Sequence, residues 1–159
     1  MRQAWLRGSR RGFTLIELIL TISIIVLLAL LVAPKIMNAY PRVAAKSEGL
    51  RLRADLTYAQ QLAITNSQKH RVSFDTVTEH IRISRVDGAN LVTVSEREIE
   101  NGVDLVMGTF AGGYVEFNVL GEPSAGGTVT LRGTDGTAVT VTVKPGTGLV
   151  TVACNGDPL

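Results

Sequence analysis

Few residues of this 159-residue chain have the types and spacing that catalysis or metal binding requires. Ser124 follows Glu122 by two positions, whereas a nucleophile elbow carries glycine there, so Ser124 is interpreted as a loop serine. His70 and His80 occur singly, without further ligands at the spacing of a metal site, and we expect surface or strand-edge histidines. The sequence therefore predicts neither an enzyme nor a metal centre.

The remaining polar candidates are better explained as turns. Asp135 and Asp157 could suggest calcium, but Asp135 precedes a glycine, which is typical of a hairpin turn. The segment Gly146-Thr147-Gly148 lacks the third glycine and the following helix of a dinucleotide site. Cys154 is the single cysteine, so we expect a free or partly buried thiol. No cofactor is predicted.

Glu17 is the residue whose position calls for a chemical explanation, because it lies inside an apolar segment. Residues 13–33 contain 17 apolar residues out of 21, and as a helix they would span about 31 Å, the thickness of a hydrocarbon core. A carboxylate within such a span costs roughly 2.5–3.5 kcal/mol, so it needs a partner. The partner would be the helix N-terminus or a positive charge from another chain. A cut before Phe13 would create an α-amine one turn away.

A basic segment precedes this predicted span. Residues 1–12 carry four arginines and no acidic residue, which predicts a cytoplasmic N-terminus with the rest of the chain across the membrane. An ordinary secretory signal is the alternative, but its apolar core would be shorter, and the only small-residue end is Ala33 before Pro34. Without residues 1–12 the formal net charge changes from +2 to −2. The basicity therefore gives no support to a nucleic-acid partner.

The segment Gly12-Phe13-Thr14-Leu15-Ile16-Glu17-Leu18 resembles the processing signal of type IV pilins and type II secretion pseudopilins. The resemblance implies that a prepilin peptidase cleaves between Gly12 and Phe13 and that Phe13 is then N-methylated. It also implies that Glu17 pairs with the N-terminal amine of a neighbouring subunit during assembly. Pro34 stands where these proteins commonly carry a helix-kinking proline.

The chain beyond the span changes from a helical to an extended pattern. Residues 34–68 predict an amphipathic continuation of the helix, weakened by Pro41 and Gly49 and ending at Asn66-Ser67-Gln68. Its apolar face, at helical spacing, comprises Leu52, Leu56, Ala59 and Ala63. The stripe should pack on a sheet, with the opposite face turned to solvent or to neighbouring subunits.

Residues 69–159 are expected to form a periplasmic β domain, because apolar residues alternate there with a period of two. The strand candidates are Val72/Phe74, Ile81/Ile83, Leu91/Val94, Val115/Phe117, Val129/Leu131, Val139/Val141/Val143 and Leu149 to Val152. Glycine-containing turns separate them. The predicted fold class is α+β, with a long N-terminal helix packed on antiparallel sheets, two in number.

Two further segments resemble the GspH/FimT group of minor pseudopilins, namely Tyr58 to Ile64 and Val115 to Leu131. The group often has an arginine where Gln60 stands, and its last strand often begins Gly-Arg, whereas this chain has Gly148-Leu149. DNA-binding members use basic residues near that strand, but no lysine or arginine follows Lys144.

The resemblance implies a structural subunit of the type II secretion pseudopilus. Such a subunit takes part in assembly or initiation of the pseudopilus, and so in protein secretion across the outer membrane. The alternative is a FimT-like minor pilin of a type IV pilus or competence system, acting in pilus assembly or DNA uptake. The implied partners are other pseudopilins or pilins, prepilin peptidase and the inner-membrane assembly platform. The implied location is the bacterial inner membrane, in a single pass, and then the filament.

Overall fold

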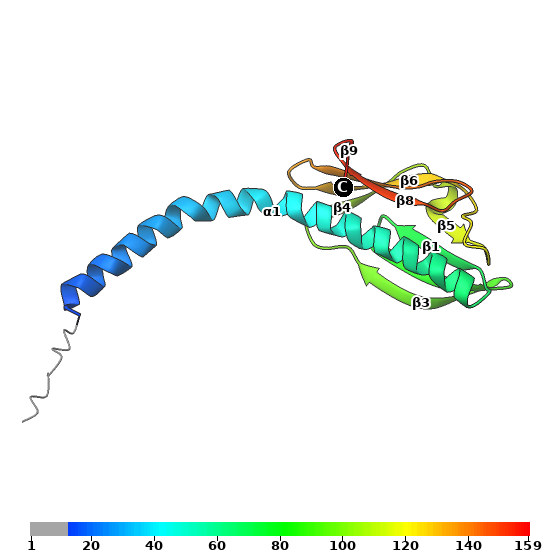
Figure 1. The fold of residues 1–159 in the computed structure, drawn as a ribbon, viewed down its shortest axis with the longest axis horizontal. Coiled ribbons are helices and arrows are strands. Elements are labelled where there is room, and N and C mark those ends of the chain that lie inside the picture. Colours follow the sequence, from blue (N-terminus) through cyan, green and yellow to red (C-terminus); the bar gives the residue numbers. More distant parts are fainter. Residues whose placement is uncertain (1–12) are drawn as a thin grey trace, which may run out of the picture. The chain divides into compact units, whose positions relative to one another are not determined.

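Helix α1 (Leu15–Thr65) is the longest element of the protein and contributes to both of its compact units (Figure 1). The computed structural model describes residues 13–159, without the side chains of residues 31–39 and Met107. The first unit ends at Met37 and the second begins at Asn38.

The described part of the first unit is helical from Leu15 onward, and its large apolar side chains are exposed. Among the described residues, no helix combines the length and the hydropathy that crossing a membrane requires. The end of the predicted span, residues 31–33, falls where side chains are not described, and so does the side chain of Pro34. The predicted leader, residues 1–12, lies outside the described residues.

In the second unit, α1 buries the predicted stripe completely. Leu52, Leu56, Ala59 and Ala63 each have 0% exposure. Pro41 does not end the helix, which runs on to Thr65 and stops where Ser67 takes a positive φ of 49°. The Gln68 N–H then donates to the carbonyl oxygen of Ala63 at 3.2 Å, and the Ser67 N–H donates to that of Ile64 at 3.3 Å. These two bonds form a Schellman motif, which satisfies carbonyls at the helix end.

Two antiparallel sheets follow the helix, as the sequence predicts. The first sheet contains β1 (His70–Asp75), β2 (His80–Asp87), β3 (Asn90–Glu98) and β5 (Tyr114–Phe117), in the order β3-β2-β1-β5. The second contains β4 (Val103–Met107), β6 (Gly127–Gly133), β7 (Ala138–Val143), β8 (Val150–Cys154) and β9 (Asp157–Pro158), in the order β4-β6-β7-β8-β9. A short 3-10 turn, η1 (Ala111–Gly113), precedes β5. Strands β4 and β9 lie outside the predicted strands.

The chain crosses between the sheets before either is complete. Strand β4 pairs with β6 in the second sheet, although β5, which lies between them in sequence, pairs with β1 in the first. Buried apolar residues from both sheets form one core cluster with the stripe of α1, whereas the apolar residues of the edge strand β3 are exposed. At Gly49, an added Cβ would lie 2.4 Å from Cγ1 of Val139 and 3.4 Å from Cγ1 of Val152, so the helix and the second sheet are in close contact there.

Candidate functional site

The N-terminus of α1 begins at the residues that the sequence singles out. Thr14 precedes the first helical residue, and its Oγ1 accepts a hydrogen bond from the backbone N–H of Glu17 at 3.3 Å. Thr14 is therefore the N-cap, and Glu17 is at the third helical position, the spacing of a capping box. Phe13 stands just before the cap and is 83% exposed.

The position of Glu17 explains how one chain tolerates this carboxylate. Glu17 lies in the first turn of α1, where the free N–H groups and the helix dipole favour a negative charge. One of the two partners expected from the sequence, the helix N-terminus, is thus present within the chain. Pairing of Glu17 with the amine of a neighbour remains a prediction, and Gly12 of the predicted cleavage site lies outside the described residues.

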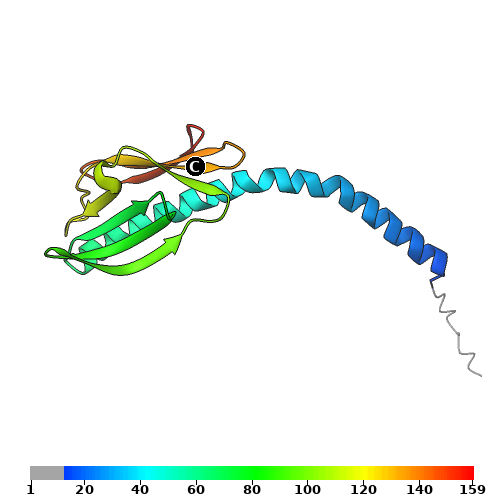
Figure 2. The same ribbon diagram turned by 180° about the vertical axis from the view of Figure 1, so that it is seen from behind.

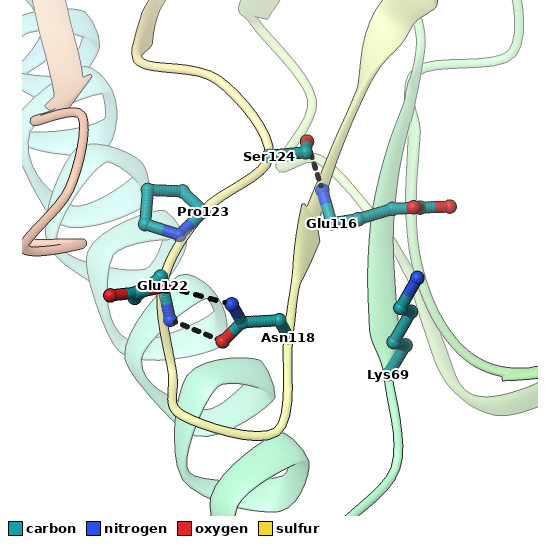
Figure 3. A pocket seen from close by; sticks show the side chains of 6 residues that line it. All are labelled: Lys69, Glu116, Asn118, Glu122, Pro123 and Ser124. Carbon is teal, nitrogen blue, oxygen red and sulfur yellow. Dashed lines mark hydrogen bonds between the residues drawn. The ribbon is translucent and has the colours of Figure 1, made fainter.

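The hydrogen bonds of Ser124 are those of a residue that stabilises a loop. It lines an open cavity of about 200 Å³ together with Lys69, Glu116, Asn118, Glu122 and Pro123 (Figure 3). Its Oγ accepts a hydrogen bond from the Glu116 N–H at 3.2 Å, while its own N–H donates to the Glu116 carbonyl at 2.7 Å. Asn118 closes the same loop by bonding both the side chain and the N–H of Glu122 at 2.9 Å. Ser124 therefore holds the loop against β5, as expected of a loop serine.

The histidines and the cysteine divide between core and surface. The expectation of a surface or strand-edge position is wrong for His70, which is 1% exposed, because it shares the inward face of β1 with Val72 and Phe74. Its Nδ1 lies 3.0 Å from the Gln68 carbonyl oxygen, which satisfies that ring nitrogen. His80 is half-buried at the start of β2. Cys154 is a free thiol buried on β8.

Asp135 lies in the turn between β6 and β7, as its following glycine predicts. Its carboxylate accepts hydrogen bonds from the Thr137 N–H at 3.0 Å and the Thr137 hydroxyl at 2.7 Å. These bonds to the Thr137 side chain and backbone lower the pKa of Asp135. The residue is thereby committed to holding the turn.

A buried ion pair that the sequence analysis missed fixes α1 to the edge strand β3. Glu48 has 0% exposure, and its Oε2 accepts a hydrogen bond from Nη1 of Arg97 at 2.6 Å. Arg97 also donates from Nε to Oδ2 of Asp55 at 2.7 Å. Partial burial lowers the pKa of Arg97, but the bonds to Asp55 and Glu48 outweigh it and raise that pKa. The sequence feature that could have indicated this ion pair is the acidic residue Glu48, one helical turn before Leu52 and therefore on the buried face.

The same network extends to the protein surface. Arg51 donates from Nη1 to Oε1 of Glu48 at 2.7 Å and lies 3.4 Å from Oε2 of Glu100. The hydroxyl of Tyr40 donates to Oε1 of Glu100 at 2.8 Å, and this hydrogen bond raises the pKa of Tyr40. Three turns of α1 are therefore tied to the connection that follows β3.

Two arginines on the first sheet, Arg71 and Arg82, are each paired with a carboxylate. Arg71 donates from Nε to Oε1 of Glu116 at 2.8 Å and lies 4.0 Å over the ring of Tyr114. Arg82 donates from Nη2 to Oε1 of Glu96 at 2.6 Å. A surface that binds phosphates needs cations free to replace counterions, so these paired arginines do not form one.

Gln60, where the resembling group often has arginine, joins α1 to two loops. Its Nε2 donates to the Gly121 carbonyl at 2.8 Å and lies 3.5 Å from the Thr147 carbonyl. Gly148, with φ of 65°, passes so close that an added Cβ would lie 2.5 Å from Nε2 of Gln60. The side-chain amide of Gln60 therefore has a structural role, because it links α1 to the two loops.

Comparisons with known proteins show what the sequence of this chain is similar to. Residues 7–33 match the family model of the prokaryotic N-terminal methylation motif, and residues 48–147 match that of the type II transport protein GspH. The chain is 30% identical over 145 residues to the competence protein ComGD of Bacillus subtilis, covering 91% of this chain and 94% of that protein.

Two solved structures share the fold. The minor pseudopilin EpsH from the type 2 secretion system of Vibrio cholerae superposes with a TM-score of 0.59 at 16% identity, covering 71% of this chain and 98% of that one. The type IV minor pilin FimU of Pseudomonas aeruginosa superposes with a TM-score of 0.60 at 14% identity, covering 74% and 94%. At these identities the likeness concerns the fold alone.

Proposed function

The chain belongs to the GspH family of minor pseudopilins, type IV pilin-like structural proteins that are not enzymes, and we propose that it takes part in assembling a competence-type filament. The observation that carries this proposal is the similarity to the competence protein ComGD, which extends over 91% of this chain and 94% of that protein. Prepilin processing and inner-membrane anchoring follow from the methylation motif at residues 7–33. The finer assignments rest on individual residues.

Processing is the first of these assignments. A prepilin peptidase cuts between Gly12 and Phe13, and Phe13 is N-methylated. The position of Thr14 supports this site, because α1 starts with its own cap immediately after the new N-terminus. Mass spectrometry of the chain co-expressed with prepilin peptidase is the test. A mature chain that starts at Phe13 supports the assignment, whereas an N-terminus still at Met1, or a cut after Ala33, contradicts it.

Assembly is the second. Residues 13–33 anchor the chain in the inner membrane, with the N-terminus cytoplasmic and the β domain periplasmic, and then enter the filament core, where Pro34 kinks the helix. Glu17 pairs with the N-terminal amine of a neighbouring subunit, which compensates a carboxylate in an apolar setting. Glu17→Val should leave cleavage intact and reduce incorporation into filaments, with the exposed Glu98→Val as the control. Normal incorporation of Glu17→Val would mean that the pairing is wrong.

A type II secretion pseudopilus is the second candidate machine, favoured by the GspH family match over residues 48–147. The two candidates predict different losses in a deletion strain of the source organism. Loss of transformation by added DNA with normal secretion supports the competence filament. Loss of secreted enzymes with normal transformation supports the secretion pseudopilus and overturns the competence assignment. Complementation with the intact chain is the control.

A further inference from the structure

An open groove separates α1 from the start of strand β8 in the second unit. Its volume is about 500 Å³, within the range of ligand sites. Residues 147–150 line one wall, and Arg53, Thr57 and Gln60 of α1 line the other. In Figure 1, β8 and the second half of α1 lie on the near side of the second unit, and in Figure 2, seen from behind, both lie on its far side. The two walls therefore belong to the same side of this unit.

The backbone of β8 is bonded to β7 along one edge. The Lys144 N–H donates to the Leu149 carbonyl at 2.9 Å, and the Asn155 N–H donates to the Ala138 carbonyl at 2.8 Å. In an antiparallel pair, every second residue of a strand directs its N–H and carbonyl groups toward the same neighbour. Residues 149, 151, 153 and 155 therefore face β7, and residues 150, 152 and 154 face the opposite edge.

That opposite edge of β8 is only partly covered. The pairing with β9 begins at Cys154, and the Leu159 N–H donates to the Val152 carbonyl at 2.9 Å. Val150 directs its N–H and carbonyl the same way as Val152, but no other hydrogen bond among the described residues reaches these two groups. Val150 is only 5% exposed, and backbone groups at such a position are normally paired. The edge of β8 at Val150 therefore lacks a partner inside the described chain.

The free groups of Val150 fit an extended backbone. In an antiparallel ladder, the N–H and carbonyl of one residue are matched by the carbonyl and N–H of a single residue opposite. A segment in line with β9, beyond Leu159, would complete such a pair and lie in the groove. Leu149, which is 52% exposed, offers an apolar contact there. The Thr57 hydroxyl donates to the Arg53 carbonyl at 2.9 Å, so this wall of the groove does not need a polar partner at Thr57.

The groove is held in shape by contacts within the chain. Gln60 donates to the Gly121 carbonyl and lies 3.5 Å from the Thr147 carbonyl, which fixes the loop before β8 to α1. Gly148 takes a positive φ of 65° beside the Gln60 amide, a conformation that other residues rarely adopt. A docked segment would therefore not have to order this loop, and that lowers the cost of binding.

The charge of the groove indicates what kind of segment it favours. Arg53 is the one charged side chain among the described residues that line it. None of the salt bridges within the described part of the chain involves Arg53. An acidic side chain on the docked segment would pair with Arg53, whereas a basic one would be repelled, and such contacts discriminate between partners.

We propose that this groove binds an extended segment of another protein, which adds to β8 at Val150 and carries an acidic side chain opposite Arg53. This mode of recognition is β-strand addition, in which main-chain hydrogen bonds provide affinity and side-chain contacts provide specificity. The inference goes beyond the proposed function, because it concerns an edge of the second sheet and not the processing or assembly of α1.

Two synthetic peptides test the charge selection. Both have seven residues with threonine and valine in alternation, and the central residue is glutamate in one and lysine in the other. Backbone amide chemical shifts of the full-length protein in detergent micelles are followed during titration. The Val150 amide should shift, and the glutamate peptide should bind about fivefold more tightly than the lysine peptide. Arg53→Glu should reverse this order, and Arg82→Glu, on the first sheet, should leave it unchanged.

A proline substitution tests the backbone contact. Val150→Pro removes the N–H that faces the groove but no hydrogen bond to β7, and proline is accepted at the first residue of a strand. Affinity for the glutamate peptide should fall about tenfold, while the melting temperature changes little. Thr151→Pro is the matched control, because the Thr151 N–H faces β7 and its loss should lower the melting temperature.

Methylated peptides test the same contact without altering the protein. The glutamate peptide is prepared with the N–H groups of alternate residues methylated, in both possible phases. In an extended segment, alternate N–H groups face opposite edges, so one phase should lose binding to β8 and the other should retain it. Equal affinity of the two phases would show that no strand is added.

The proposal is overturned if neither peptide shifts the Val150 amide, if both peptides bind equally, or if folded Val150→Pro binds like the unaltered protein. Weaker peptide binding at higher protein concentration would assign the groove to a second copy of this chain, which also overturns it. Cleavage at Phe13 and incorporation into filaments are measured in parallel on the same variants. Normal processing and incorporation without peptide binding would refute this site and leave the proposed function intact.

Discussion

Removal of Arg97 should destabilise the second unit more than removal of any surface arginine. In the variant Arg97→Met, Oε2 of the fully buried Glu48 loses its cation, while Oε1 keeps Arg51 at 2.7 Å. Breaking a buried ion pair from one side costs about 3–5 kcal/mol. Arg97 is itself 26% exposed and Arg51 remains, so the lower end applies, about 3 kcal/mol. For a unit of this size that lowers the melting temperature by about 10 °C.

Thermal unfolding of the full chain in detergent, followed by the β-sheet signal in circular dichroism, measures this loss. Arg82→Met is the matched control, because it breaks the exposed Arg82–Glu96 pair and should change the melting temperature little. The double variant Glu48→Met/Arg97→Met should recover most of the stability, since no buried charge is left unpaired. The reasoning is refuted if Arg97→Met melts at the same temperature as Arg82→Met, or if the double variant is the least stable of the three.

Three further outcomes are expected. Gln60→Ala removes the 2.8 Å bond to the Gly121 carbonyl, which should cost about 1 kcal/mol and speed amide exchange in both loops that Gln60 joins; unchanged exchange would contradict that role. Gly108→Ala would place a Cβ 1.8 Å from the backbone oxygen of Thr128, so urea denaturation should show a loss of about 2–3 kcal/mol, more than Gly49→Ala, whose nearest obstacle is the Val139 side chain. Hydrogen bonds from the Thr78 side chain and backbone and from the Val77 backbone lower the pKa of Asp75 below its ordinary value of 3.8. The carboxylate therefore stabilises the turn fully at a pH above 3.8, and this stabilisation is lost as the pH falls through the lowered pKa. Amide exchange of Val77 and Thr78 across an acid titration checks this, and a loss of protection already at pH 5 would show that the carboxylate is not the cause.

Much of the fold could be predicted because it depends on local periodicity. The stripe from Leu52 to Ala63 is buried as expected, since helical spacing places those residues on one face whatever covers them. The same period of two places His70 on the inward face of β1 with Val72 and Phe74. The sequence prediction placed His70 at the surface because its side chain is polar. Strand β4 offers only a short alternation between Gly102 and Gly108, which is too little to distinguish from a loop.

The pairing of the elements could not be predicted, because it depends on residues far apart in the sequence. Nothing near Glu48 indicates that its cation comes from Arg97, 49 positions later. The proposed assembly residues differ in kind. The roles proposed for Phe13 and Glu17 come from the resemblance to a processing signal and involve other chains, and the kink proposed at Pro34 comes from the position of that proline in the resembling proteins. The structure adds the cap that Thr14 provides for α1, which follows from the Thr-x-x-Glu spacing alone.

The chain leaves the first sheet to form β4 and returns to it at β5, and this path constrains the order in which the two sheets can form. During folding, strands β1, β2 and β3 can pair with one another early, because these pairings join neighbouring segments of the chain. Strand β4 must wait for β6, and the first sheet stays incomplete until β5 returns to β1. Neither sheet is a continuous piece of chain, so neither can fold, be deleted or be transplanted as a module. The two sheets should therefore unfold as one cooperative unit.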